Sequence, residues 1–141
     1  MGETIMAKTK DGYKVIIPLS FKGYKLIKVL GSGSSSVVCL VENQFSKKLY
    51  SAKIIPKKYI KENNLAEQIE NEISIMKKID HRNIVKFQET FEFKNQYNQI
   101  NKVIIMEYCE NGDLCSYILK NGFESDSQKM KITLGFLNGI K

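Results

Sequence analysis

Short apolar runs alternate with turn-forming residues along the first half of the chain. The runs "YKLIKVL" (24–30), "SVVCLVEN" (36–43) and "KLYSAKIIP" (48–56) are rich in β-branched and aromatic residues. Such runs, bounded by glycine, proline or polar residues, are typical of strands. A stretch of glycine and serine (31–36) joins the first two runs, so it lies inside a predicted hairpin.

The spacing of the apolar residues changes in "NLAEQIENEISIMKKI" (64–79). Apolar side chains recur there at helical intervals, at Leu65, Ile69, Ile73 and Met76. Acidic residues come first and lysines last, which suits the helix dipole. A helix is therefore predicted over 64–79, followed by two more strands, "NIVKFQETFEF" (83–93) and "KVIIMEY" (102–108).

The two ends of the chain carry weaker patterns. Residues 1–22 are predicted to be irregular, and Pro18 limits their one apolar stretch, "YKVIIPL", to an edge strand or a loop. After the last strand, Asp113 is a plausible N-cap for a short helix over 114–120. Ser125 begins a capping box for a final helix that runs to the end. The order predicts an α+β fold.

The charge and composition narrow the classes of partner. The net charge is +7 at pH 7, but it comes almost entirely from dispersed lysines, and Arg82 is the only arginine. Arginine is the preferred reader of bases and phosphates, so we expect solvated surface lysines and no nucleic-acid partner. The chain has no apolar run long enough to span a membrane and no apolar signal core. We expect no membrane partner and a cytoplasmic location, with the nucleus as the alternative.

The cysteines do not suggest a metal site. Cys39, Cys109 and Cys115 are odd in number, and their spacing fits no zinc motif. In a chain without a secretory signal, reduced and buried thiols are the expected state.

The glycine and serine stretch admits two interpretations. By composition it is a flexible tether. By spacing, Gly31, Gly33 and Val38 occur where a phosphate-covering loop would have them, because glycine lets backbone N–H groups approach a phosphate without a side-chain clash. This stretch alone does not decide between a plain turn and a phosphate-covering loop.

Two charged residues occur in apolar surroundings. Lys53 lies in the third predicted strand among apolar neighbours, so it either faces solvent or reaches into a cleft. Glu72 falls at the edge of the apolar stripe of the predicted helix, where an unpaired carboxylate is costly to bury. A lysine from the sheet would relieve it, whereas the alternative is a glutamate at the rim of the helix.

Four segments in order are similar to the N-terminal lobe of a eukaryotic protein kinase. They are "LGSGSSSVVCLV", "YSAKIIPKK", "NEISIMKKIDHRNIVKFQETFE" and "VIIMEYCENGDL", and the similarity covers about residues 22–141. The middle part most resembles calcium/calmodulin-dependent and calcium-dependent Ser/Thr kinases. The resemblance implies a five-stranded antiparallel sheet with one main helix, then a hinge and two helices of the C-terminal lobe. The implied divisions are an extension (1–22), the N-lobe (23–108) and the hinge with an incomplete C-lobe (109–141).

The resemblance implies that the chain binds ATP and assigns loop roles by position. Gly31 and Gly33 match the first two glycines of the phosphate-covering loop. Ser36 stands where the third glycine would be, a departure from the pattern. Val38 would lie above the adenine.

The resemblance also assigns roles on the third strand and the main helix. Ala52 would line the adenine pocket. Lys53 would hold the phosphates, and Glu72 would fix Lys53 in an ion pair.

Further roles follow at the end of the last strand and beyond. Met106 would be the gatekeeper at the back of the pocket. Glu107 and Cys109 would offer backbone groups to the adenine edge, and Asp113 could reach the ribose. His81 resembles a structural histidine.

The sequence lacks the motifs that would carry phosphoryl transfer. "HRN" (81–83) precedes the hinge-like segment instead of following it, and there is no Asp-Phe-Gly. No catalytic and no metal-binding residue is therefore predicted in this chain, and Mg²⁺ is expected only with a missing C-terminal part. We expect 141 residues of this kind to be inactive alone.

Three interpretations remain open at this point. The chain is an ATP-binding fragment of a Ser/Thr kinase that phosphorylates protein hydroxyls when complete. Alternatively it is a non-catalytic, kinase-like module that binds a protein or weakly binds nucleotide. An unrelated binding protein with a Gly/Ser tether is the least favoured.

Overall fold

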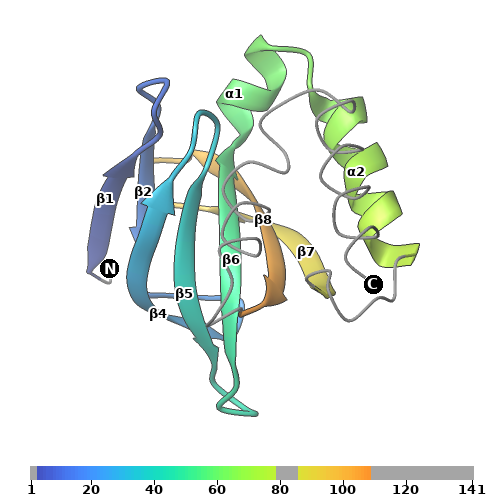
Figure 1. Cartoon of the computed structure of the whole chain (residues 1–141). Coiled ribbons are helices and arrows are strands. Elements are labelled where there is room, and N and C mark those ends of the chain that lie inside the picture. Colours follow the sequence, from blue (N-terminus) through green and yellow to red (C-terminus); the bar gives the residue numbers. More distant parts are fainter. Residues whose placement is uncertain (1–2, 79–85, 109–141) are drawn as a thin grey trace.

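The computed structural model describes residues 3–78 and 86–108. A six-stranded antiparallel sheet in the order β3-β4-β5-β6-β8-β7 forms its body, and a separate hairpin, β1-β2, lies beside it (Figure 1). The strands are β1 (Thr4–Lys8), β2 (Lys14–Pro18), β3 (Ser20–Phe21), β4 (Tyr24–Ser32), β5 (Val37–Asn43), β6 (Leu49–Pro56), β7 (Phe87–Lys94) and β8 (Ile100–Glu107). The helices are α1 (Lys57–Glu62) and α2 (Ala66–Lys78).

Most of the predicted elements are confirmed. β4, β5, β6 and β8 occupy the predicted strand segments, and α2 occupies the predicted helix, each to within a few residues. β7 covers the later part of the predicted strand 83–93, and the first residues of that strand lie outside the described residues. The two predicted helices after residue 113 also lie outside them.

β2 is the edge strand that Pro18 allowed in "YKVIIPL", but the rest of 1–22 was wrongly predicted to be irregular, and the count of five strands was also wrong. β1 and β2 form an antiparallel hairpin, and β3 adds a sixth strand to the sheet. β3 turns into β4 through Lys22 (φ 50°) and Gly23 (φ 82°), so both central residues of this tight turn have positive φ. That is the backbone of a two-residue hairpin turn, but without the usual Asn-Gly or Asp-Gly signal.

The short helix α1 was also missed. Its N-cap residue is Pro56, which ends β6 and supplies no side-chain hydrogen bond. A proline after an apolar run indicates the end of a strand, yet proline is equally suited to the beginning of a helix. Only Ile60 of α1 is buried, so the apolar pattern of six residues gives little helical signal.

Two apolar clusters occupy opposite faces of the sheet. On β5, Val37, Cys39 and Val41 belong to one cluster, whereas Val38 belongs to the other. This alternation follows from the two-residue period of a strand. The second cluster also contains Ile69, Ile73 and Met76 of α2, so the helix packs on that face. Figure 1 shows α2 on one side of the molecule and the β1-β2 hairpin on the other.

The β1-β2 hairpin is part of the folded body. Val15 and Ile17 of β2 are fully buried, with 0% exposure, and they join the cluster that contains Phe21 and Tyr24. Side chains buried to this extent each contribute about 1.5–3 kcal/mol to folding. The hairpin is therefore held by the same core as the sheet. Within the described ranges, no helix is long and apolar enough to cross a membrane.

Candidate functional site

Lys53 lies in the middle of β6, and its side chain is fully buried. Its partners in the strand register are Val38 of β5 and Ile104 of β8. Both partners belong to the apolar cluster that packs against α2. Lys53 is therefore on the helix-facing side of the sheet, since paired residues of neighbouring strands share a face.

Glu72 lies on the buried face of α2, together with Ile69, Ile73 and Met76. Its side chain is 1% exposed, and Gln68 Nε2 donates a hydrogen bond to its Oε1 at 3.5 Å. The structure thus places a buried ammonium on the sheet and a buried carboxylate on the helix that packs over it. Two opposite charges withdrawn from water in one layer can compensate each other's desolvation.

The glycine and serine stretch forms the connection from β4 to β5, as the hairpin prediction required. Gly31 pairs with Val38 in the register, and the Gly33 N–H donates to the Ser36 carbonyl oxygen at 2.8 Å. The stretch is therefore a closed turn between two strands of one sheet. A tether between domains would not have this pairing.

The turn of the β1-β2 hairpin holds this loop from outside. The Lys10 N–H donates to the Gly33 carbonyl at 2.7 Å, and the Asp11 N–H donates to the Ser34 carbonyl at 3.3 Å. The hairpin turn is itself closed by a hydrogen bond from the Gly12 N–H to the Thr9 carbonyl at 2.9 Å. The backbone of the loop is thus anchored by residues that are more than twenty positions earlier in the chain.

Replacing Lys10 by Pro should loosen the glycine loop, because it removes the N–H that donates to Gly33. Lys10 is the second residue of the turn that starts at Thr9, a position that proline favours, so the hairpin itself should persist. One backbone hydrogen bond is worth about 0.5–1.5 kcal/mol. We therefore expect hydrogen exchange over residues 33–36 to accelerate about twofold to tenfold, measured by mass spectrometry.

Lys10→Ala is the matched control, because it removes the same side chain but keeps the N–H. Its exchange over residues 33–36 should equal that of the unchanged chain. Equal exchange in the Pro and Ala variants would contradict an anchoring role for the hairpin.

The structure does not bring Ala52 together with Lys53. Ala52 belongs to the apolar cluster on the other face of the sheet, with Val37 and Cys39. Ser51 is the residue on the Lys53 face: it pairs with Leu40 of β5 and Met106 of β8. Ser51 is fully buried, and its hydroxyl has no hydrogen-bond partner among the described residues. The alternation of side chains along the strand places Ser51 on the same face as Lys53, so this pattern could have identified Ser51 from the sequence.

Of the remaining predicted residues, those on β8 are described by the structure and those after it are not. Met106 is fully buried in the cluster with Val38 and α2. Glu107 is exposed; its N–H donates to the Lys86 carbonyl at 3.0 Å, and its carboxylate accepts from the Lys86 N–H at 3.2 Å. Cys109 and Asp113 lie outside the described residues, as does His81.

The described cysteine has the predicted state. Cys39 is a free thiol, and burial raises its pKa to about 12. The thiolate is the reactive form of cysteine, so this side chain is inert near neutral pH. Cys109 and Cys115 lie outside the described residues.

Apolar side chains surround the one buried cation on this face of the sheet in the described part of the chain. Val38 and Met106 are fully buried on the Lys53 face, and Leu30, before the glycine loop, packs against the same cluster. Over residues 3–78 and 86–108, no group of three or more His, Cys, Asp or Glu side chains could hold a metal ion.

Comparison with known proteins agrees with this geometry. The family model described as the protein kinase domain matches residues 24–141. The chain is 36% identical over 118 residues to the serine/threonine-protein kinase cds1 of Schizosaccharomyces pombe, a match that covers 81% of the chain and 25% of that protein. It is 38% identical over 119 residues to calcium-dependent protein kinase 4 of Plasmodium falciparum, which covers 83% of the chain and 21% of that protein.

A third relative matches along the whole chain. Serine/threonine-protein kinase SIK1 of Rattus norvegicus is 30% identical over 141 residues, which is 100% of the chain and 17% of that protein. The chain spans a quarter or less of the length of these three relatives.

Proposed function

The chain belongs to the protein kinase domain family, and from this premise we propose that it is the ATP-binding part of a serine/threonine protein kinase. The observation that carries the proposal is the fully buried Lys53 on the sheet face that packs against α2. A lysine is rarely buried unless it is paired with an acidic group or binds a ligand. ATP would be such a ligand, since its phosphates attract an ammonium group.

Each predicted residue then has a separate role in binding, and two of them, Cys109 and Asp113, lie outside the described residues. The Lys53 ammonium holds the α- and β-phosphates, and Glu72 forms an ion pair that orients it. Val38 and Met106 enclose the adenine with apolar surface. The loop that carries Gly31 and Gly33 covers the phosphates with backbone N–H groups. The hinge residues Glu107, Cys109 and Asp113 contact the adenine edge and the ribose.

Ser51 replaces Ala52 in this proposal as the small residue of the adenine pocket. It lies on the face of Lys53 and Met106, and its hydroxyl lacks a hydrogen-bond partner among the described residues. A small side chain leaves room for a ring, and a free hydroxyl can bond to it or to a bridging water.

The proposed reaction of the whole kinase is transfer of the γ-phosphate of ATP to a serine or threonine hydroxyl of a protein. The residues described above bind and orient the nucleotide. Mg²⁺ would neutralise charge on the phosphates, and its ligands and the base for the hydroxyl belong to motifs that these 141 residues do not contain. We therefore propose that this chain alone binds ATP without transferring its phosphate.

The proposal is tested by titrating the chain with a fluorescent ATP analogue and displacing the analogue with ATP. Saturable binding that ATP reverses is expected, and incubation with radiolabelled MgATP and a serine-containing protein should give no phosphoprotein. Failure to bind the analogue would contradict the nucleotide role and favour a non-catalytic module that binds a protein. Measurable phosphotransfer would contradict the claim that the chain is catalytically incomplete.

A further inference from the structure

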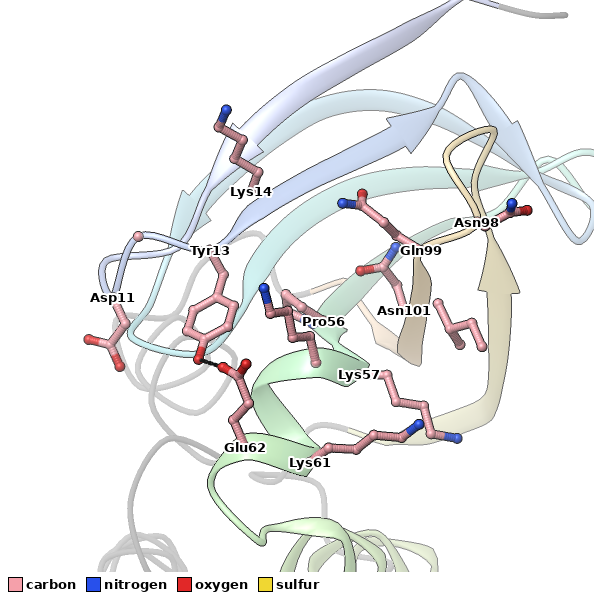
Figure 2. A pocket seen from close by; sticks show the side chains of 13 residues that line it. Asp11, Tyr13, Lys14, Pro56, Lys57, Lys61, Glu62, Asn98, Gln99 and Asn101 are labelled. Carbon is pink, nitrogen blue, oxygen red and sulfur yellow. Dashed lines mark hydrogen bonds between the residues drawn. The ribbon is translucent and has the colours of Figure 1, made fainter.

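A pocket of about 930 Å³ opens on the side of the molecule where three segments meet. They are the turn of the β1-β2 hairpin with the first residue of β2 (11–14), helix α1 with its N-cap Pro56 (56–62), and the turn from β7 with the first residues of β8 (98–101) (Figure 2). None of the proposed ATP-binding residues lines it. The cavity is within the size range of small-ligand sites.

The charged side chains of this pocket are mainly basic. Four lysines and two carboxylates line it: Lys14, Lys57, Lys58, Lys61, Asp11 and Glu62. Two of these charges are already engaged, since Lys57 Nζ bonds to Glu92 Oε2 at 2.6 Å and Glu62 accepts a hydrogen bond from the Tyr13 hydroxyl. The remaining cations outnumber the remaining carboxylate, so an anion is the favoured ligand.

A buried amide at the pocket is the second observation. Asn101 lines the pocket and is only 2% exposed, yet its Nδ2 has no hydrogen-bond partner among the described residues. In the strand register it stands opposite Pro56, whose backbone has no N–H. A buried donor without an acceptor is costly, and a ligand oxygen would remove that cost.

The walls of the pocket are held in place by contacts of their own. The Tyr13 ring packs edge-to-face on Tyr59 with centroids 5.1 Å apart. The Tyr13 hydroxyl donates a hydrogen bond to Glu62 (Figure 2). The hydrogen bond to Glu62 raises the pKa of Tyr13, which is consistent with the hydroxyl acting as the donor. These contacts join the hairpin turn to α1 and keep the pocket open between them.

We propose that this basic pocket binds a phosphate monoester, with Lys58 and Lys61 supplying charge and the Asn101 amide supplying a hydrogen-bond donor. A phosphate monoester carries nearly two negative charges and three strong acceptor oxygens, which a carboxylate does not. The cavity has room for more than the phosphate itself, so a phosphorylated serine side chain fits it better than a free ion. The site does not depend on nucleotide binding at Lys53.

The test is a titration of the isotope-labelled chain followed by NMR on the Asn101 side-chain amide and the backbone amides of residues 11–14. The probes are capped phosphoserine, capped serine and inorganic phosphate. Capped phosphoserine should shift these signals saturably, and capped serine should not. Tighter binding of capped phosphoserine than of inorganic phosphate supports a phosphorylated side chain as the source, and equal binding supports a free phosphate.

The Lys58→Gln/Lys61→Gln double variant should weaken binding about tenfold or more, because it removes both proposed charged hydrogen bonds to the phosphate. Both lysines are exposed, so the fold should be unaffected. Lys28→Gln/Lys48→Gln is the matched control: it removes the same charge from exposed sites outside the pocket and should change affinity less than twofold.

Asn101→Asp keeps the size of the side chain but replaces the donor with a carboxylate, so it should abolish binding. Two results would overturn the proposal. One is the absence of a saturable shift with both phosphate probes. The other is equal affinity in the Lys58→Gln/Lys61→Gln variant and the unchanged chain.

Discussion

Replacing Glu72 by Ala should lower the free energy of unfolding by about 3–5 kcal/mol. The substitution leaves the fully buried Lys53 ammonium without the carboxylate that we propose as its ion-pair partner. An uncompensated charge in an apolar layer is far more costly than the loss of a surface contact. Urea unfolding monitored by circular dichroism gives the free energy directly.

Glu70→Ala is the matched control on the same helix. Glu70 forms an ion pair in which its Oε2 lies 2.6 Å from Lys102 Nζ, and the side chains of Glu70 and Lys102 are 60% and 13% exposed. Exposed pairs contribute about 0.2–1 kcal/mol, and this pair is exposed on the Glu70 side only, so the loss should be about 1 kcal/mol, near the upper end of that range. If Glu72→Ala is no more destabilising than Glu70→Ala, the proposed pairing of Glu72 with Lys53 is wrong.

The double variant Lys53→Met/Glu72→Met separates pairing from packing. Replacing both charges with apolar side chains should cost less than Glu72→Ala alone, since no buried charge is left behind. The single variants of this cycle are Lys53→Met and Glu72→Met. The loss of unfolding free energy in the double variant, minus the sum of the losses in these two single variants, measures the coupling between the two residues. Additive losses would mean that the two side chains do not interact.

The strands and the main helix could be predicted because burial imposes a period on the sequence. α2 has buried residues at Ile69, Glu72, Ile73 and Met76, which is the helical spacing seen in the letters alone. β4, β5 and β6 are short apolar runs bounded by turns, and the sheet pairs them in chain order. The position of Glu72 at the edge of the stripe also followed from this period.

The N-terminal segment could not be predicted in the same way. β1 has a mostly half-buried or exposed pattern, and only Val15 and Ile17 of β2 are fully buried. Two buried positions in an edge hairpin give too weak a signal to separate a strand from a loop. The hydrogen bonds from Lys10 and Asp11 to the glycine loop involve backbone atoms, which leave no trace in the choice of residues.

Ala52 was assigned to the adenine pocket by resemblance, although the two-residue period of a strand argues against that position. Neighbouring residues of a strand point to opposite faces, so Ala52 cannot share a face with Lys53 once both lie in regular β6. The register places Ser51 beside Met106 instead. The strand period was available from the sequence and would have selected Ser51.

Replacing Lys53 by Met should weaken binding of the fluorescent ATP analogue about tenfold to a hundredfold. The ammonium is the one buried cation on the face where Val38 and Met106 gather in the described part of the chain. Charged hydrogen bonds to phosphate contribute about 1.5–3 kcal/mol, which corresponds to that range of affinity. The titration is run well below the unfolding temperature of the variant, with circular dichroism to verify the fold.

Lys28→Met is the matched control, because Lys28 is an exposed lysine on β4 and carries the same charge. Its loss should leave the affinity nearly unchanged. The control matters in a chain with a net charge of +7, where any lysine attracts a polyphosphate from a distance. Long-range attraction would make the two variants equally weak and would fade with added salt, whereas direct contact makes only Lys53→Met weak. Equal affinities would therefore remove Lys53 from the nucleotide site, even if ATP still bound.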